Sequence, residues 1–370
     1  MKQLTILAAG ALMLAACTPK SETPAEPRLC DAFPNYTIGA AINVNQSNQL
    51  DTAGIAILKQ HFNSIVPENC MKSEEIHPAE DTYYWDDADR YVQFGVDNGF
   101  QVIGHCLVWH SQCPRWMCHD TEGNLVSADV LKQHIKDHIT TVVTRYKGRI
   151  TGWDVVNEAI VEDGSYRNSD FYKILGEEFI PWAFECAHEA DPDLELYYND
   201  YGMAVPGRRE GVVRLIKQLK ERGLRIDAVG LQSHMGMDHP DWDEFETSIK
   251  AFIECGVDVQ FTEVDMSALP TVNWGANVSD TEEYQESLNP YKDALPDSVS
   301  VVWNERMAKF LSIVDKYADH VKRVTAWGVN DADSWKNDWP IPGRTDYCLW
   351  FDREGNMKPF LQERMANTQQ

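Results

Sequence analysis

Short apolar runs recur along the chain at intervals typical of strands that alternate with helices. Segments with a helical spacing of apolar residues lie between these runs, and one of them, 210–222, is followed by Gly223, a common helix stop. Eight alternating strand and helix units predict a single-domain α/β fold, the (β/α)₈ TIM barrel. The eight predicted strands are 37–43, 62–66, 101–107, 151–157, 194–200, 226–232, 257–263 and 322–329.

Polar and aromatic residues follow seven of these predicted strands, where a barrel of this kind carries its functional groups. The fourth strand ends in Asn157 and Glu158, and the seventh ends in Glu263, two residues before Asp265. A carboxylate at the end of a buried strand carries a desolvation cost, so two of them indicate a carboxylate pair at one site. Such a pair is the minimum equipment for cleaving a glycosidic bond with an acid and a nucleophile or base.

The N-terminal segment differs in composition from the rest of the chain. Lys2 precedes an apolar stretch, and Leu-Ala-Ala precedes Cys17, which predicts a secretory signal over residues 1–17. A cysteine at this place resembles the bacterial lipobox and would be the lipidated first residue of the mature protein; cleavage without lipid is the alternative. Residues 18–32, rich in Pro, Glu, Ser and Thr, are expected to form a flexible tether, and residues 33–370 the globular domain.

The composition narrows the class of partner. A net charge of −25 leaves no basic surface for phosphates, which argues against nucleic acid. Twelve Trp and fourteen Tyr suit a neutral polysaccharide, because flat aromatic faces pack against sugar rings.

Thr18 follows Cys17 where an Asp would indicate inner-membrane retention, so we expect an exported lipoprotein of the outer membrane, at the cell surface or the periplasmic face. A monomer is the default expectation.

The eight cysteines after Cys17 show no disulfide framework in their spacing. Cys113 and Cys118 are the most plausible local pair. The spacing around Cys118 and His119 fits neither haem attachment nor a zinc site, and the glycine-rich dinucleotide fingerprint is absent. We therefore expect no metal and no organic cofactor.

Seven motifs, in chain order, resemble the strand-end motifs of glycoside hydrolase family 10: VPENCMK, GHCLVWHSQCPRW, WDVVNE, YYNDY, VGLQSHM, FTEVDM and AWGVNDADSW. The resemblance extends from about Ile38 to Phe360. Members of that family are mostly retaining endo-1,4-β-xylanases, so it implies hydrolysis of xylan and xylo-oligosaccharides. A segment near 271–298 looks like an insertion seen in xylanase lipoproteins of Bacteroidetes, on the active-site face.

The resemblance also implies roles for individual residues. Glu158 matches the general acid/base and Glu263 the nucleophile, while His234 and Asp265 match a pair that orients Glu263 and keeps it ionised. Asn157 matches the donor to the sugar 2-hydroxyl. The residues that match the floor and wall around the sugar before the cleaved bond are Glu68, Asn69, Lys72, His105, Trp109 and Gln112. Trp327 and Trp335 match the indoles over that sugar. Tyr201 and Gln232 are two further cleft residues.

Departures from the family pattern are small: Cys106 stands where Thr is commoner, and Met235 and Val264 replace other apolar residues. Two other functions stay open. One is a different retaining β-glycanase on the same barrel, acting on mixed-linkage glucan, cellulose or mannan. The other is a surface glycan-binding protein without catalysis. Five tryptophans are expected to serve packing alone: Trp85, Trp153, Trp182, Trp242 and Trp303.

Overall fold

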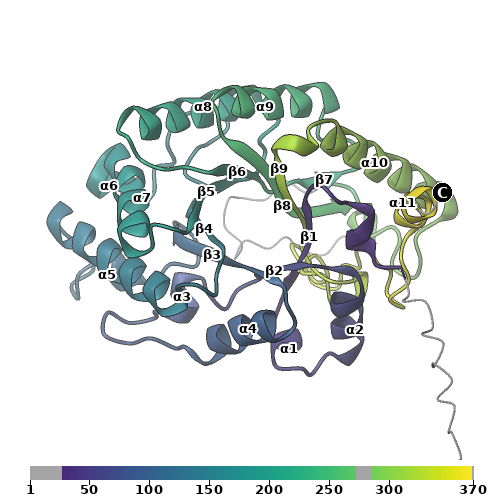
Figure 1. Cartoon of the computed structure of the whole chain (residues 1–370), viewed down its shortest axis with the longest axis horizontal. Coiled ribbons are helices and arrows are strands. Elements are labelled where there is room, and N and C mark those ends of the chain that lie inside the picture. The colour runs from purple at the N-terminus through teal and green to yellow at the C-terminus, as the bar shows by residue number, and fades with distance from the viewer. Residues whose placement is uncertain (1–26, 272–285, 369–370) are drawn as a thin grey trace, which may run out of the picture.

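Eight parallel strands close into a barrel in the computed structural model of the chain, which describes residues 27–271 and 286–368 (Figure 1). Each strand pairs with its neighbour in chain order, and the ring closes through β6 with β8 and β9 with β1. The predicted (β/α)₈ fold is therefore confirmed. The barrel strands are β1 (Thr37–Ile42), β2 (Ser64–Pro67), β3 (Gln101–Trp109), β4 (Gly152–Asn157), β5 (Glu195–Asp200), β6 (Ala228–Leu231), β8 (Asp258–Ser267) and β9 (Val321–Ala326).

The sixth predicted strand is followed by a short extra strand, β7 (His234–Gly236), which pairs with β8. The break between β6 and β7 falls at Ser233, whose φ of 63° lies in the left-handed region that strands do not adopt. The register places His234 of β7 opposite Asp265 of β8. The kink therefore turns the chain so that His234 stands beside the carboxylates at the end of β8.

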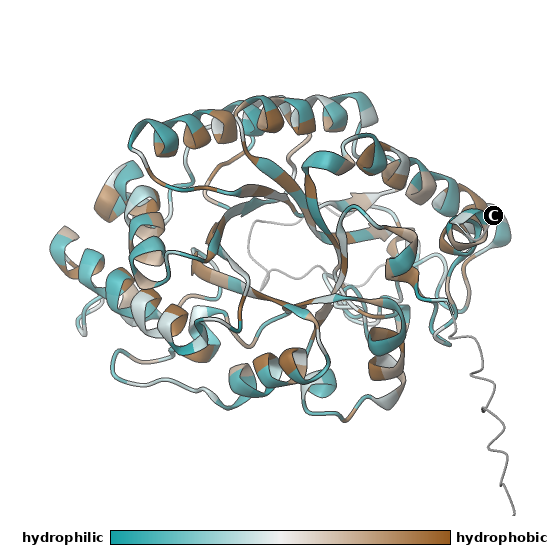
Figure 2. Cartoon of the chain, in the orientation of Figure 1, coloured by the Kyte–Doolittle hydropathy of each residue, from teal (hydrophilic) through white to brown (hydrophobic). Residues whose placement is uncertain are grey.

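Helices surround the barrel and present apolar residues to it. In Figure 2 hydrophobic residues colour much of the barrel strands, while the helices alternate between hydrophobic and hydrophilic positions. In α5 the buried residues include Leu131, Ile135, Ile139 and Val142, a spacing of three to four that places them on one face. The helices are α1 (Val44–Ser47), α2 (Thr52–His61), α3 (Ser73–Ile76), α4 (Asp86–Asp97), α5 (Ala128–Tyr146), α6 (Asp170–Leu175), α7 (Phe179–Ala190), α8 (Pro206–Glu221), α9 (Trp242–Glu254), α10 (Asp297–Lys316) and α11 (Pro359–Thr368).

Large side chains fill the barrel interior beneath the C-terminal strand ends. Tyr197, Ile103 and Trp327 belong to one buried cluster there. A neighbouring strand position must be glycine to admit the Tyr197 ring, because a Cβ on Gly152 would lie 2.3 Å from the tyrosine oxygen. The interior is thus a packed core, and the space left for a ligand lies above it.

The start of the globular domain corrects one expectation. Leu29–Ala32, the end of the expected tether, forms a 3₁₀ helix that packs on the barrel, and Leu29 is fully buried. The Leu29 amide donates to His61 Nδ1 (3.3 Å), and the Ala32 carbonyl accepts from Arg364 Nε (3.2 Å). The boundary at residue 33 is therefore wrong, because apolar Leu29 and Cys30 belong to the core.

Several expectations concern chain outside the described ranges. Cys17, the signal segment and the tether up to residue 26 lie there, as do residues 272–285 of the insertion. Within the described ranges, no helix combines the length and apolar character needed to cross a bilayer. The described end of the insertion is joined to the loop that follows β9, since buried Asn289 donates to the Gly343 carbonyl (3.1 Å).

Candidate active site

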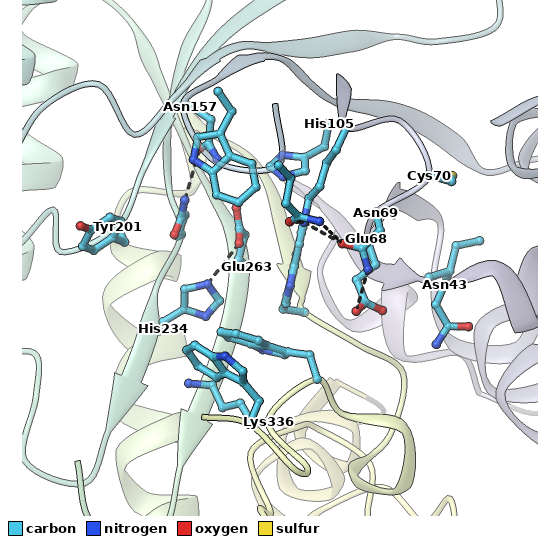
Figure 3. A pocket seen from close by; sticks show the side chains of 18 of the residues that line it. Asn43, Glu68, Asn69, Cys70, His105, Asn157, Tyr201, His234, Glu263 and Lys336 are labelled. Atoms are coloured by element: carbon cyan, nitrogen blue, oxygen red, sulfur yellow. Dashed lines mark hydrogen bonds and ion pairs between the residues drawn. The ribbon is translucent and has the colours of Figure 1, made fainter. Parts of the chain in front are cut away.

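A cleft of about 1350 Å³ opens at the C-terminal ends of the barrel strands (Figure 3). Strand register brings its polar residues together, because Trp109 pairs with Asn157 and Asn157 with Asn199 across β3, β4 and β5. Asp265 lies beneath the cleft, fully buried. The other predicted site residues all line it: Glu68, Asn69, Lys72, His105, Trp109, Gln112, Asn157, Glu158, Tyr201, Gln232, His234, Glu263, Trp327 and Trp335.

Glu158 projects into the cleft directly after β4. Its backbone is left-handed, with φ of 59°, and is held by bonds from its amide to the Asn199 carbonyl (2.9 Å) and from Arg167 Nε to its own carbonyl (2.8 Å). A non-glycine residue in this region is strained, and such strain gathers at functional sites. The carboxylate accepts a hydrogen bond from Gln232 Nε2 (3.0 Å).

Burial raises the pKa of Glu158 above its usual 4.5, and the negative charge of Glu263 adds to that rise. The hydrogen bond from Gln232 and the neighbouring Trp109 indole act in the opposite direction without cancelling the effect. Glu158 therefore keeps its proton to higher pH than an ordinary glutamate does. A carboxylic acid in this state can give a proton to a bound ligand.

Glu263 lies on β8 in the opposite state. Burial disfavours its ionised form, but the hydrogen bond from His234 Nε2 (3.1 Å) and the charge of nearby histidines hold its pKa below 4.5. Asn199 Nδ2 donates to its other oxygen (2.8 Å). A carboxylate that ionises readily and is held by donors on both oxygens, in a cleft beside one that keeps its proton to higher pH, is equipped for nucleophilic attack.

A line of charged groups supports Glu263 from below. His234 Nδ1 faces Asp265 Oδ2 at 2.9 Å, while burial alone would lower the histidine pKa. The two carboxylates outweigh that effect and raise the pKa of His234 to about 9, so the imidazolium donates to both. Asp265 in turn accepts from Trp335 Nε1 (2.8 Å) and lies 3.3 Å from the buried Lys336 ammonium.

Amide side chains connect the two glutamates. Asn199 Nδ2 donates to Glu263 and also lies 3.1 Å from Asn157 Oδ1. Gln232 Nε2 donates to Glu158 and lies 3.3 Å from the same Asn157 oxygen. Since Asn157 Oδ1 accepts from both sides, the amide nitrogen of Asn157 is its group for donating to a ligand hydroxyl.

One wall of the cleft is a polar cluster around Lys72. The Lys72 ammonium donates to Asn69 Oδ1 and Gln112 Oε1, each at 2.8 Å, and lies 5.0 Å from the centre of the Trp109 ring. Burial lowers the pKa of Lys72, and the neighbouring acidic groups oppose that shift. Asn69 also donates to Glu68 (3.3 Å), so the wall presents several fixed hydrogen-bonding groups to a ligand.

The model of glycosyl hydrolase family 10 matches residues 29–366 of the chain. The chain belongs to this family. It is 48% identical to endo-1,4-beta-xylanase A of Xylanibacter ruminicola over 366 residues, covering 98% of both chains, and 39% identical to the beta-1,4-xylanase of Dictyoglomus thermophilum, covering 91% of this chain and 90% of that one. The solved GH10 endoxylanase from a sugarcane soil metagenome superposes with a TM-score of 0.87 at 39% identity, covering 92% and 99% of the two chains.

Sequence reasoning missed several residues of this family 10 cleft. Asn199 and Lys336 were not assigned roles, although Asn199 lies within the motif YYNDY and Lys336 directly follows AWGVNDADSW; only the strand register and side-chain contacts reveal them. Trp339 stacks on Trp335, with ring centroids 4.4 Å apart, and lines the cleft. Trp85, expected to serve packing alone, also lines it, while Trp153 and Trp303 are buried as expected.

Arg167 is a further residue that the sequence did not single out. It reaches from the loop after Glu158 to donate to the Tyr201 hydroxyl (3.0 Å) as well as to the Glu158 carbonyl. Arg208 lies over the other side of this contact, 4.1 Å from the Tyr201 ring centre. Tyr201 is therefore held in place at the cleft by two arginines.

The cysteines of this family 10 chain are free thiols throughout the described ranges. The pairing of Cys113 with Cys118 is therefore wrong for this structure; both are held in hydrophobic surroundings instead, and burial raises the pKa of each thiol. Cys106 is also buried, beside the cleft floor. In the part of the chain that the structure describes, His, Cys, Asp and Glu form no group suited to a metal ion.

Proposed function

We propose that the chain is a retaining endo-1,4-β-xylanase, which hydrolyses internal β-1,4-xylosidic bonds of xylan by double displacement. The observation that carries this proposal is the opposite tuning of two buried glutamates in one cleft: the pKa of Glu158 is raised and that of Glu263 is lowered. One group is thereby ready to give a proton and the other to attack carbon.

In the first step Glu158 protonates the glycosidic oxygen while a Glu263 oxygen bonds to the anomeric carbon. The bond from that carbon to the leaving oxygen breaks, and the sugar is left esterified to Glu263. Positive charge develops on the sugar ring, and a hydrogen bond from the Asn157 amide to the 2-hydroxyl strengthens as it does so. His234 and Asn199 orient Glu263 for the attack.

In the second step the same residues exchange roles. Esterification removes the charge of Glu263, which had helped to raise the pKa of Glu158, so the Glu158 carboxylate is now a better base. Glu158 takes a proton from water, the water oxygen bonds to the anomeric carbon, and Glu263 leaves as a carboxylate. Two inversions give net retention, with Glu158 protonated again.

Xylan is favoured as the substrate by the relatives. The X. ruminicola protein, which is 48% identical over 98% of both chains, is an endo-1,4-beta-xylanase. Several other relatives at 34–38% identity are endo-1,4-beta-xylanases too. A long open cleft suits attack within a chain. A mixed-linkage glucanase, cellulase or mannanase is not favoured, because these relatives are xylanases. A glycan-binding protein without catalysis is not favoured, because both glutamates and their supporting contacts are in place.

A product time course tests the function. The purified full chain is incubated with unbranched xylan, glucuronoxylan and carboxymethylcellulose, and products are separated by length. Early release of mixed xylo-oligosaccharides, with carboxymethylcellulose nearly untouched, is expected. Greater activity on cellulose or glucan would keep the two glutamates but overturn the substrate, and xylo-oligosaccharides left intact for hours would indicate a binding protein.

We further propose that the chain is an exported lipoprotein, lipidated at Cys17 and held at the outer membrane, and that it acts as a monomer. The support is the Leu-Ala-Ala-Cys sequence followed by Thr18. Labelling with radioactive palmitate in a bacterial host, followed by separation of inner and outer membranes, tests the anchor against a Cys17→Ser variant. Label in both proteins, or a wild-type chain free of membranes, would contradict the anchor.

The oligomeric state is tested by light scattering of the mature Cys17→Ser chain without detergent, which should give the mass of one chain.

A further inference from the structure

The cleft continues past the residues that sequence reasoning assigned to sugar binding. Beyond Glu68 and Asn69, as seen from Glu263, lie Asn43 and Cys70 (Figure 3). The lining then reaches the segment that leads into α4, including the exposed Tyr84. A ligand long enough to pass Glu68 and Asn69 would therefore meet this far end of the cleft.

Tyr84 is held facing outward by its two neighbours. The rings of Tyr83 and Trp85 stack on each other at 3° with centroids 4.7 Å apart, and Tyr83 also stacks on His77 at 3.7 Å. Because these two rings lie together, the side chain between them points the other way, and 65% of Tyr84 is exposed. A backbone bond from the Tyr84 amide to the Ile76 carbonyl (2.9 Å) fixes this segment.

The surroundings of Tyr84 have the composition of a sugar site. Val44, at the start of α1, is 39% exposed and lines the same cleft, and α1 lies beside α4 (Figure 1). Asp87 and Arg90 of the first turns of α4 add hydrogen-bonding groups and are paired with each other at 2.8 Å. Flat apolar surface with a few fixed polar groups is what a sugar ring requires.

We propose that Tyr84 is the platform of a distal subsite, which binds a further xylosyl unit on the non-reducing side, beyond the units held by Glu68 and Asn69. This inference rests on the proposed xylanase function and adds a residue that sets chain-length preference. The tyrosine ring packs against one face of the sugar, and Val44 and the Asp87–Arg90 pair border the site. Long oligosaccharides reach the subsite, whereas a two-sugar glycone does not.

The test compares Tyr84→Ala with Tyr84→Phe, which keeps the ring, and with Leu50→Ala, a control at a residue that is 72% exposed and does not line the cleft. For each protein the ratio of kcat/KM on xylohexaose to kcat/KM on an aryl β-xylobioside is measured, so that the fraction of active enzyme cancels. We expect the ratio to fall about two- to tenfold in Tyr84→Ala, the range of an aromatic contact, and to be kept in Tyr84→Phe and Leu50→Ala.

A second measurement uses xylopentaose labelled at its reducing end, because loss of a distal subsite moves the position of cleavage. An altered pattern of labelled products in Tyr84→Ala alone supports the subsite. If wild type cleaves both substrates but Tyr84→Ala keeps the wild-type ratio and pattern, the subsite is wrong and the xylanase function stands. If wild type cleaves neither substrate, the proposed function itself fails.

Discussion

Asn199 Nδ2 donates a hydrogen bond to Glu263 Oε1 at 2.8 Å, although its strand β5 is separated from β8 in the barrel by β6. Asn199 is fully buried, and Thr262 Oγ1 donates to its side-chain oxygen (2.6 Å), which fixes the amide orientation. The amide nitrogen must therefore face the Glu263 carboxylate. Asn199 thus takes part in keeping that carboxylate ionised and aimed.

Replacing Asn199 should slow the reaction with little change in the fold of the barrel. Asn199→Ala removes a hydrogen bond to a charged group, worth about 1.5–3 kcal/mol, so we expect kcat to fall about 10- to 100-fold. Thr262→Val is the matched control, since it removes only the contact that orients Asn199, and its loss should be smaller. Steady-state kinetics on an aryl xylobioside measure both, and an Asn199→Ala variant with the wild-type kcat would contradict the role.

The two glutamates should respond differently to substitution. Glu263→Ala removes the nucleophile, and we expect turnover to fall about 10⁴-fold or more on every substrate while circular dichroism stays unchanged. Glu158→Ala removes the proton donor, so the loss should be large on xylan and smaller on aryl glycosides whose leaving group needs no proton. Azide should speed the Glu158→Ala reaction, because it attacks the glycosyl-enzyme without a base; equal losses on all substrates would reverse the assignment.

Activity should depend on pH as a bell-shaped curve. With rising pH, kcat/KM increases as Glu263 ionises, with a pKa below 4.5, and decreases as Glu158 loses its proton, with a pKa above 4.5. His234→Asn removes a positive charge and a donor from Glu263, so the pKa of Glu263 rises and the acid limb moves to higher pH. A His234→Asn profile with an unmoved acid limb would show that the histidine does not control Glu263.

Much of the fold followed from the sequence because alternating apolar strands and helices leave few alternatives. The predicted strands agree with the observed ones to within a few residues, and the carboxylates do lie at strand ends in one cleft. The short extra strand β7 was missed, since the left-handed backbone at Ser233 that precedes it has no glycine to mark it. The tether boundary was wrong because the Pro- and Glu-rich composition of residues 18–32 indicated a tether, although the apolar Leu29 at its end belongs to the core.

The missed site residues depend on three-dimensional facts. Lys336 becomes a partner of Asp265 only because the loop after β9 folds back along the cleft to the end of β8. Tyr84 is exposed at the cleft because its two neighbours stack on each other, and the sequence of three adjacent aromatic residues does not specify this arrangement. The motif resemblance therefore identified the reacting groups, whereas the contacts that set their pKa and orientation are visible only in the three-dimensional structure.

Two buried histidines should make stability depend on pH. His77 Nδ1 and His138 Nδ1 lie 3.0 Å apart, and burial lowers the pKa of His77 and lowers that of His138 from 6.5 to about 3. Below pH 6.5 the unfolded state therefore binds more protons at these histidines than the folded state does. The stabilising effect is therefore complete above pH 6.5 and decreases as the pH falls below that value. For His138 the loss continues toward pH 3, at up to about 1.4 kcal/mol per pH unit.

Urea unfolding between pH 7.5 and 4 measures this dependence. His138→Asn should be less stable than wild type at pH 7.5, since it loses a packed ring, but its free energy of unfolding should fall less steeply with decreasing pH. His188→Asn, at an exposed position on α7, is the control and should keep the wild-type slope. Parallel slopes for wild type and His138→Asn would rule out a role for this histidine pair.

Trapping the covalent intermediate tests the proposed mechanism most directly. The full chain is incubated with a 2-deoxy-2-fluoro-β-xylobioside that carries a good leaving group. The fluorine slows both formation and hydrolysis of the ester, and the good leaving group speeds its formation alone, so the ester accumulates. Peptide mass spectrometry then locates the adduct. The predicted result is one fluoroxylobiosyl group per chain, attached to Glu263, with activity lost in proportion. Label on another residue, or xylan hydrolysis by an enzyme that forms no adduct and inverts the anomeric carbon, would contradict double displacement at Glu263.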